Sequence, residues 1–103
     1  MPVARPTEFQ VEMLCQMMSC AFLEIRIFGW DGNAERAADL ADAFQNLPNL
    51  LFSDEFDWEL FRNTYLKNYQ DNHSISSFDY VAILDEIQAG VNPFKPKKLK
   101  IYE

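Results

Sequence analysis

The spacing of apolar and polar residues along this chain favours helices almost throughout. In the first third, the apolar majority is interrupted at helical spacing by one narrow polar stripe, formed by Glu12, Gln16, Ser19 and Arg26. Thr7 with Gln10 three residues later has the pattern of a capping box, and Gly29 suits the turn that ends a helix. We therefore expect a first helix over residues 7–28, apolar on most sides and central in the fold.

Glu24 departs from the polar stripe of this first helix. A carboxylate that faces packed neighbours needs a hydrogen-bond partner or a raised pKa, because a surrounding of low polarity disfavours its charged form. If the helix packs as its pattern indicates, Glu24 must meet one of these two conditions.

A second helix is expected from Ala34 to about residue 46, with Asn33 as its N-cap. Leu47 and Pro48 should end it, because the residue before a proline avoids helical backbone angles. Its inward face is rich in alanine, so it can pack closely. Its outward edge carries acids in steps of four and three, with no lysine beside them: Glu35, Asp39 and Asp42.

Two further helices follow. The third covers about residues 57–71 and carries its aromatic residues close to one face, at Trp58, Phe61, Tyr65 and Tyr69. The fourth is capped by Ser76 or Ser77 and ends at Gly90.

The predicted fold class is all-α, a compact four-helix domain with an extended basic C-terminal tail. The 103 residues form a single domain with a core over about residues 7–90. The tail, residues 91–103, has two prolines and four lysines. Apolar and polar residues alternate over two short stretches, which could each be a strand. At residues 24–27 the flanking residues favour a helix, and at 98–101 both interpretations stay open.

Negative charge is concentrated in the middle of the sequence. Residues 31–59 contain eight acids and one arginine, a local charge of −7 that equals the formal net charge of the whole chain. The acids are Asp31, Glu35, Asp39, Asp42, Asp54, Glu55, Asp57 and Glu59. Such a field repels phosphate backbones and anionic lipid and attracts basic surfaces. The expected partner is therefore a basic protein, and neither nucleic acid nor a membrane.

Aromatic residues accompany these acids in the connecting segments, at Trp30, Phe52, Phe56 and Trp58. Rings flanked by carboxylates suit a contact surface between proteins. The predicted partner-binding residues are Trp30, Asp31, Glu35, Asp39, Asp42, Asp54, Glu55 and Trp58. The alternative is that the acids only keep the protein soluble and that the rings close the ends of the helical bundle.

The sequence lacks a set of residues typical of an enzyme or a metal site. Zinc needs four cysteine or histidine ligands, and the chain has Cys15, Cys20 and His73 alone. The helix acids are expected to face outward, and the loop acids lack the glycine and the final glutamate of a calcium loop. His73 could act as a base with Asp71 near it, but a lone loop histidine is usually exposed and idle. No catalytic residue, metal or cofactor is expected.

The two cysteines lie five residues apart on one helix, which points them about 140° apart and prevents a mutual disulfide. Their position among methionines predicts two buried thiols with raised pKa values. Thiols without a disulfide framework fit a reducing compartment. The most apolar stretch is interrupted by charged and polar residues, which argues against a membrane span or a secretion signal. A cytoplasmic location is therefore expected.

The stretch EIRIFGWDGNAERAADLADAFQNLP, followed by FDWELF and FDYVAILDEI, resembles a group of small, acidic, uncharacterised bacterial proteins. The resemblance covers roughly residues 20–89 and contains no catalytic motif. It implies an association with toxin and immunity loci and hence a binding role, and it identifies no site residue.

The predicted function is a non-enzymatic, acidic protein-binding module, most concretely an immunity-type inhibitor that covers a basic bacterial toxin domain. The alternative is a structural or regulatory helical protein that self-associates as a homodimer through apolar faces. A third class, a small hydrolase or carboxylate-metal enzyme, would require Asp39, Asp42 or Glu24 to converge on a pocket with His73.

Overall fold

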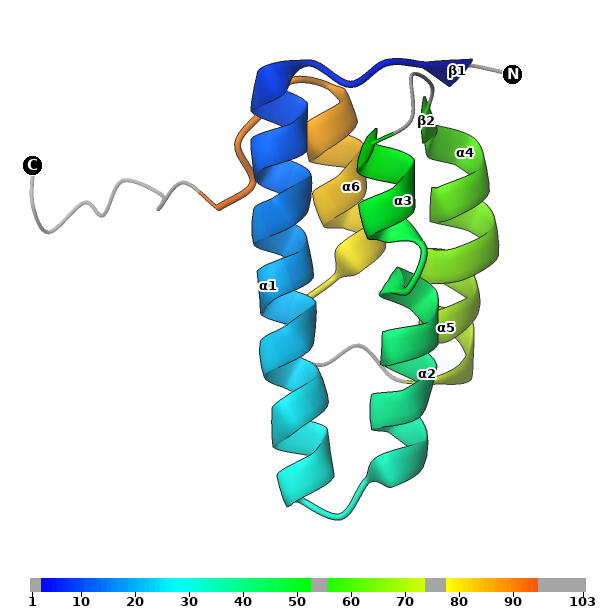
Figure 1. Ribbon diagram of the computed structural model, residues 1–103. Coiled ribbons are helices and arrows are strands. Elements are labelled where there is room, and N and C mark those ends of the chain that lie inside the picture. The colour runs from blue at the N-terminus through cyan, green and yellow to red at the C-terminus, as the bar shows by residue number, and fades with distance from the viewer. Residues whose placement is uncertain (1–2, 53–55, 74–77, 95–103) are drawn as a thin grey trace, which may run out of the picture.

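The computed structural model describes residues 3–52, 56–73 and 78–94. In this part of the chain, four antiparallel helical segments run up and down around one core (Figure 1). They are α1 (Glu8–Trp30), α2 (Ala34–Phe44), a continuous run over residues 58–72, and α6 (Tyr80–Gln88). Each segment packs mainly on its two neighbours in that cyclic order. The predicted all-α, four-helix class is confirmed.

The start of α1 is fixed by the expected capping box. The Thr7 hydroxyl accepts a hydrogen bond from the Gln10 backbone N–H at 3.1 Å, and the Gln10 side chain accepts one from the Thr7 N–H at 2.9 Å. The Gln10 amide also donates to the backbone oxygens of Ile87 and Gln88, at 3.5 and 3.3 Å. Carbonyls at a helix C-terminus lack partners within the helix, so Gln10 joins the start of α1 to the end of α6.

The turn between α1 and α2 differs from the expectation. Helix α1 continues through Gly29 to Trp30, and the residue with a positive φ is Gly32, at 81°. The predicted stop at Gly29 is therefore wrong, because the left-handed residue comes three positions later. The predicted N-cap of α2 is confirmed, since the Asn33 side chain accepts from the Arg36 N–H at 3.4 Å.

Helix α1 lies at the edge of the bundle (Figure 1). Its inner side is fully covered at Leu14, Met17 and Ala21. On its outer side, however, Phe22 is 50% and Leu23 49% exposed. The expectation of a central helix is wrong, because in a four-helix bundle each helix keeps a side that no neighbour covers.

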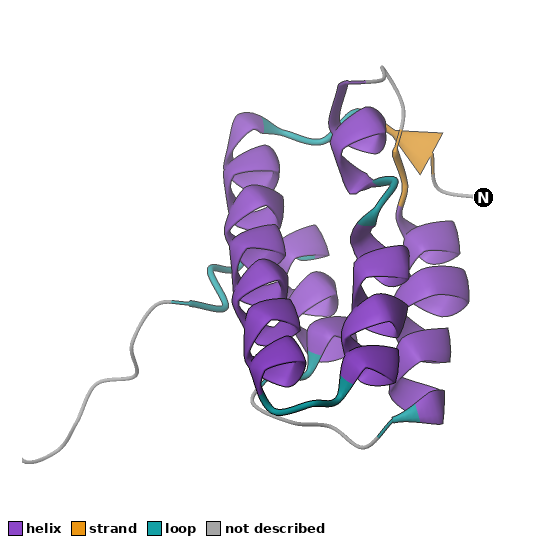
Figure 2. Cartoon of the chain, turned by 60° about the horizontal axis from the view of Figure 1, so that its bottom comes forward, coloured by secondary structure: helices purple, strands orange, loops and turns teal. Residues whose placement is uncertain are grey.

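A short helix, α3 (Leu47–Phe52), follows α2 and was not predicted. Helix α2 does end before Leu47 and Pro48, but the proline then occupies the first turn of α3, where its missing N–H is no loss. Beyond α3, strand β2 (Phe56–Asp57) pairs antiparallel with β1 (Val3–Ala4) (Figure 2). Strands of two residues are too short to show any alternation in a sequence.

The third segment is one helical run with three parts: α4 (Trp58–Leu60), the π-helical η1 (Phe61–Leu66) and α5 (Lys67–Asn72). It agrees with the predicted helix over residues 57–71. In η1 the hydrogen bonds span five residues, as in the bond from the Lys67 N–H to the Arg62 carbonyl. Such wide turns are rare and are found frequently at functional sites.

Helix α6 begins at Tyr80, with Asp79 as its N-cap, whose carboxylate accepts from the Ala82 N–H at 3.1 Å. The expected caps, Ser76 and Ser77, lie outside the described residues. After α6, Phe94 is half-buried against the core. Residues 95–103, with the lysines and the open question of a strand, also lie outside the described part.

Aromatic rings hold the centre of the bundle together. The Phe44 ring packs edge-on against Phe61 at 5.8 Å and against Tyr80 at 5.3 Å, which joins three helical segments. Leu14 and Met17 of α1 close this centre and are inaccessible to solvent. The position of every surface group described below depends on this core.

Candidate functional site

The acids of α2 lie on one edge of the helix, as expected. Glu35 and Asp42 are exposed and Asp39 is half-buried; we call these three residues the acidic edge. Asp31 is exposed at the C-cap of α1, just before α2. These four predicted binding residues therefore follow one another along the turn and the helix that follows it.

The other acids of residues 31–59 do not join this edge. Asp57 and Glu59 lie at the start of α4, at the opposite end of the bundle from Asp31 and Glu35 (Figure 1). Asp54 and Glu55 lie outside the described residues. Within the described part, the expectation of one concentrated acidic field is wrong, because the up-and-down chain path carries residue 57 to the far end of α2.

The two tryptophans have opposite environments. Trp30 is 73% exposed, and the Arg26 guanidinium lies 5.5 Å from the centre of its ring. Trp58 is 4% exposed and packs on Phe56, with the ring centres 4.7 Å apart. The prediction of Trp58 as a contact residue is wrong, because its ring closes the end of the bundle. Trp30 remains available to a partner.

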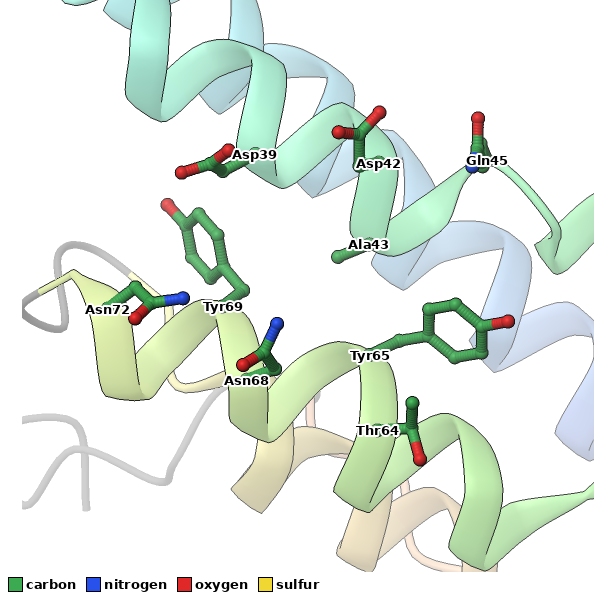
Figure 3. A pocket seen from close by; sticks show the side chains of 9 residues that line it. All are labelled: Asp39, Asp42, Ala43, Gln45, Thr64, Tyr65, Asn68, Tyr69 and Asn72. Carbon is green, nitrogen blue, oxygen red and sulfur yellow. The ribbon is translucent and has the colours of Figure 1, made fainter.

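A cavity of about 410 Å³ opens between α2 and the helical run of η1 and α5 (Figure 3). Its α2 wall contains two residues of the acidic edge, and its other wall is built of tyrosines, asparagines and a threonine. The lining residues are Asp39, Asp42, Ala43, Gln45, Thr64, Tyr65, Asn68, Tyr69 and Asn72. We call this space the α2–α5 cavity.

The α2–α5 cavity exists because small and large side chains face each other across it. Ala43 of α2 is too short to reach the opposite helix, whereas Tyr65 and Tyr69 project from that helix four residues apart. In Figure 3, the Tyr69 hydroxyl points toward Asp39. The gap is therefore lined by carboxylates on one side and by phenol rings on the other.

One end of the cavity is fastened by a contact between His73 and Asp39. The His73 Nε2 lies 2.7 Å from an Asp39 carboxylate oxygen, and the His73 side chain is 16% exposed. The Tyr69 ring lies beside the imidazole, with ring centres 5.2 Å apart. The expected neighbour, Asp71, pairs instead with Lys67 at 3.3 Å. The expectation of an idle, exposed histidine is therefore wrong.

Arg36, which follows Glu35 on α2, contacts two aromatic side chains. Its Nε donates to the Tyr69 hydroxyl at 3.0 Å, and its guanidinium lies 4.7 Å from the centre of the Phe28 ring. Burial raises the pKa of the Tyr69 phenol, and the hydrogen bond from Arg36 opposes part of that rise. Arg36 thus holds Tyr69 in place under the cavity.

Asp42 differs from Asp39 in having no such internal partner. No hydrogen bond or ion pair joins its carboxylate to another residue in the described ranges. Asp42 is exposed and lines the cavity, so its charge is accessible to a ligand. The cavity therefore combines one internally held carboxylate with one accessible carboxylate.

A second cavity, of about 280 Å³, lies between α6 and the run of η1 and α5. Its charged side chains are paired across it: Arg62 contacts both carboxylate oxygens of Asp85, at 2.7 and 3.1 Å. Gln70 bonds the Asp79 carboxylate at 3.2 Å. The charges of Arg62 and Asp85 offset each other and the Asp79 carboxylate has a hydrogen-bond partner, so the second cavity is a weaker candidate for a charged ligand.

Glu24 is buried inside the bundle and has a partner, as its position required. Its carboxylate accepts a hydrogen bond of 2.6 Å from the Tyr80 hydroxyl, and the two residues are 4% and 1% exposed. Burial, and then the hydrogen bond to Glu24, raise the pKa of Tyr80 well above its usual range. This pair joins α1 to α6 in the core.

The thiols do not match the expectation of two buried groups. Cys15 is exposed on the outer side of α1, and Cys20 is partly buried. Burial, and then the negative charge of Glu24, raise the pKa of the Cys20 thiol. The helix presents its two cysteines in different directions, as the angle between them predicted.

The groups named for a hydrolase or metal enzyme are only partly brought together. Asp39 and Asp42 line one cavity and His73 contacts Asp39, but Glu24 is buried against Tyr80. Over residues 3–52, 56–73 and 78–94, no three His, Cys, Asp or Glu side chains cluster as a metal site requires. In the same ranges no helix has the length and apolar character to cross a membrane.

The sequence analysis did not identify the residues of η1 and α5 that line the α2–α5 cavity. Tyr65 and Tyr69 were grouped with the buried rings of Trp58 and Phe61, yet they border the cavity. The polar residues Asn68 and Asn72 lie three residues after each tyrosine. That spacing places amides beside the rings on one helix face, and it could have indicated a face that is only partly buried.

The chain was compared with family models, with curated proteins and with solved structures, and none of them matches it.

Proposed function

We propose that this protein is a non-enzymatic binding module that docks a basic partner protein on the acidic edge and the α2–α5 cavity beside it. The observation that carries the proposal is the accessible Asp42 carboxylate at a cavity walled by Tyr65 and Tyr69. An accessible carboxylate suits an arginine or lysine side chain by charge, and the partly buried Tyr65 ring beside the cavity can contact the apolar part of such a side chain.

The concrete form of this role is an immunity-type inhibitor. The resemblance to small acidic proteins associated with toxin and immunity loci supports it, and such an inhibitor acts by covering its partner and needs no chemistry of its own. Glu35 and Asp42, both exposed, would speed the approach of a basic surface, and contacts inside the cavity would slow its departure.

The test uses an arginine-rich peptide as the probe, with a neutral peptide of equal length beside it. We expect only the basic peptide to bind, with an affinity that falls as salt is added. The combined change Glu35→Gln, Asp39→Asn and Asp42→Asn should slow association by about tenfold. Stopped-flow fluorescence or calorimetry measures both effects.

A matched control separates a local site from net charge. The combined change Glu8→Gln, Glu59→Gln and Glu86→Gln removes the same number of negative charges from exposed positions outside the cavity lining. It should leave association within about twofold of the unchanged protein at physiological salt. Equal losses in both triple variants would contradict the proposal, as would binding that ignores salt. Duplex DNA, included as a second probe, should not bind.

A further inference from the structure

Helix α1 lies at the edge of the bundle (Figure 1). Its outer side carries a row of exposed residues. We call this row the α1 outer seam; it consists of Glu12, Cys15, Gln16, Ser19, Phe22, Leu23, Arg26 and Trp30. The buried residues of α1 lie on the opposite side of the helix. The seam therefore has large apolar side chains in water, with Phe22 at 50%, Leu23 at 49% and Trp30 at 73% exposure.

The two charged residues of the seam, Glu12 and Arg26, have opposite signs and lie at equal distances on either side of its middle. Glu12, Ser19 and Arg26 follow one another at intervals of seven residues, so they lie nearly on one line along the helix. Glu12 is about 10.5 Å from Ser19 along the axis, and Arg26 is the same distance away on the other side. A negative and a positive end thus flank a small, uncharged centre.

We propose that two copies of this chain pair through the α1 outer seam, antiparallel, with a two-fold axis passing beside Ser19. In that arrangement Glu12 of each copy lies opposite Arg26 of the other, which forms two equivalent ion pairs. Phe22 then covers Gln16 of the second copy, and Leu23 covers its Cys15. The seam is complementary to itself in this one orientation.

The charge pattern selects the antiparallel arrangement. In a parallel pair with the same register, each Glu12 would face Glu12 and each Arg26 would face Arg26, so both ends would repel. Neither Glu12 nor Arg26 forms an ion pair with another of the described residues, so both charges are available. The ring of Trp30 under the Arg26 guanidinium, at 5.5 Å, keeps that group on the seam.

The middle of the seam carries no negative charge, which limits the repulsion between two copies of an acidic protein. Between residues 13 and 30, α1 has one acid, Glu24, and its carboxylate is buried against Tyr80. The small side chains of Cys15 and Ser19 let two helices approach closely, and the Ser19 hydroxyl already bonds the Cys15 carbonyl at 3.2 Å. The seam lies away from α5 across the bundle, so pairing leaves the α2–α5 cavity open (Figure 1).

Charge reversal and its rescue test the pairing. Sedimentation equilibrium at physiological salt should show a concentration-dependent dimer for the full chain. Glu12→Arg alone or Arg26→Glu alone should raise the dimer dissociation constant by about tenfold, because each makes both end pairs repulsive. The double variant restores opposite charges and should return to within about threefold of the starting value.

A cysteine at the proposed axis tests the register. In a background with Cys15→Ser and Cys20→Ala, Ser19→Cys should form a disulfide-linked dimer under mild oxidation, because residues at a two-fold axis face themselves. Ala38→Cys, at an exposed position of α2, is the matched control and should remain largely monomeric. The proposal is overturned by a monomer at concentrations on the order of a millimolar. Single reversals without effect, or equal cross-linking at both cysteines, overturn it as well.

Discussion

Two contacts between helices each contain a carboxylate and an aromatic side chain, and they differ in their access to water. Between α1 and α6, Glu24 and Tyr80 are 4% and 1% exposed and meet at 2.6 Å. Between α2 and α5, Asp39 and Tyr69 border a cavity of about 410 Å³, and Asp42 beside them has an accessible carboxylate. The first contact is closed, and the second is open.

The comparison teaches that the role of an acid follows from the side chains around it. The closed contact has Tyr80, whose ring is buried and whose hydroxyl donates a hydrogen bond to the carboxylate. The open contact has the short side chain of Ala43 among the residues that line its cavity, and a space of about 410 Å³ remains between the helices. An acid in the closed contact stabilises the fold, whereas one in the open contact is left with charge to offer a ligand.

Removal of the Tyr80 hydroxyl should break the closed contact and have the largest effect. Tyr80→Phe leaves the ring in place but takes one donor from a buried carboxylate, so the free energy of unfolding should fall by about 2–3 kcal/mol. Urea denaturation measures the change. Tyr65→Phe is the control, because its hydroxyl receives only a long, exposed hydrogen bond of 3.4 Å from Asn46. A loss below about 0.5 kcal/mol in Tyr80→Phe would show that the closed contact is not stabilising.

Alkaline pH should lower the free energy of unfolding through the closed contact, with the second-largest effect. The folded-state pKa of Tyr80 is raised, so above the unfolded pKa, near 10, the folded protein binds more protons than the unfolded chain. Stability from this group is therefore complete below pH 10 and is lost above it, at up to about 1.4 kcal/mol per pH unit. Urea denaturation between pH 9 and 11 follows the loss, and the slope should be smaller in Tyr80→Phe. Equal slopes would contradict the assignment.

In the open contact, loss of the Asp39 charge should have a smaller effect. Asp39→Asn weakens the contact with His73, whose side chain is partly shielded while that of Asp39 is 42% exposed. Because water already screens the pair, unfolding free energy should fall by only about 0.5–1 kcal/mol. Thermal unfolding of this variant and of His73→Asn should give similar losses. A much larger loss in one of them would indicate a partner beyond this pair.

Neutralisation of Asp42 should have the smallest effect on stability. Its carboxylate has no hydrogen bond or ion pair within the described part of the chain, so Asp42→Asn should change unfolding free energy by less than about 0.5 kcal/mol. The same variant should nevertheless weaken binding of the arginine-rich peptide. A stability loss equal to that of Asp39→Asn would remove the distinction between the two acids.

Local features of the fold could be read from the sequence. The capping box of Thr7 and Gln10, the Asn33 cap and the acidic edge of α2 depend on residues within a few positions of each other. Each is fixed by backbone geometry and helical period, which a sequence displays directly. The sequence also predicted that Glu24 needs a hydrogen-bond partner or a raised pKa, because it is a single acid on an apolar face of the helix.

Features that depend on distant residues could not be read in this way. The contact of His73 with Asp39 joins positions 34 residues apart, and the burial of Trp58 depends on how the end of the bundle closes. The α2–α5 cavity requires Ala43 to face Tyr65 and Tyr69. Which residues of two helices face each other depends on how the helices are aligned, and the periodicity of each helix does not reveal that alignment. The outer position of α1 was missed for the same reason, since a pattern shows which residues are apolar but not which side has a neighbour.

The bond between Tyr80 and Glu24 spans 56 positions of the chain. Because α1 and α6 lie in the first and last thirds of the chain, a ribosome completes α1 long before α6, and this bond can form only after Tyr80 has emerged. A contact between positions so far apart closes a long loop, and the entropy of that closure must be met before the contact stabilises the fold. The bond between Tyr80 and Glu24 is therefore a late event in the folding of the nascent chain.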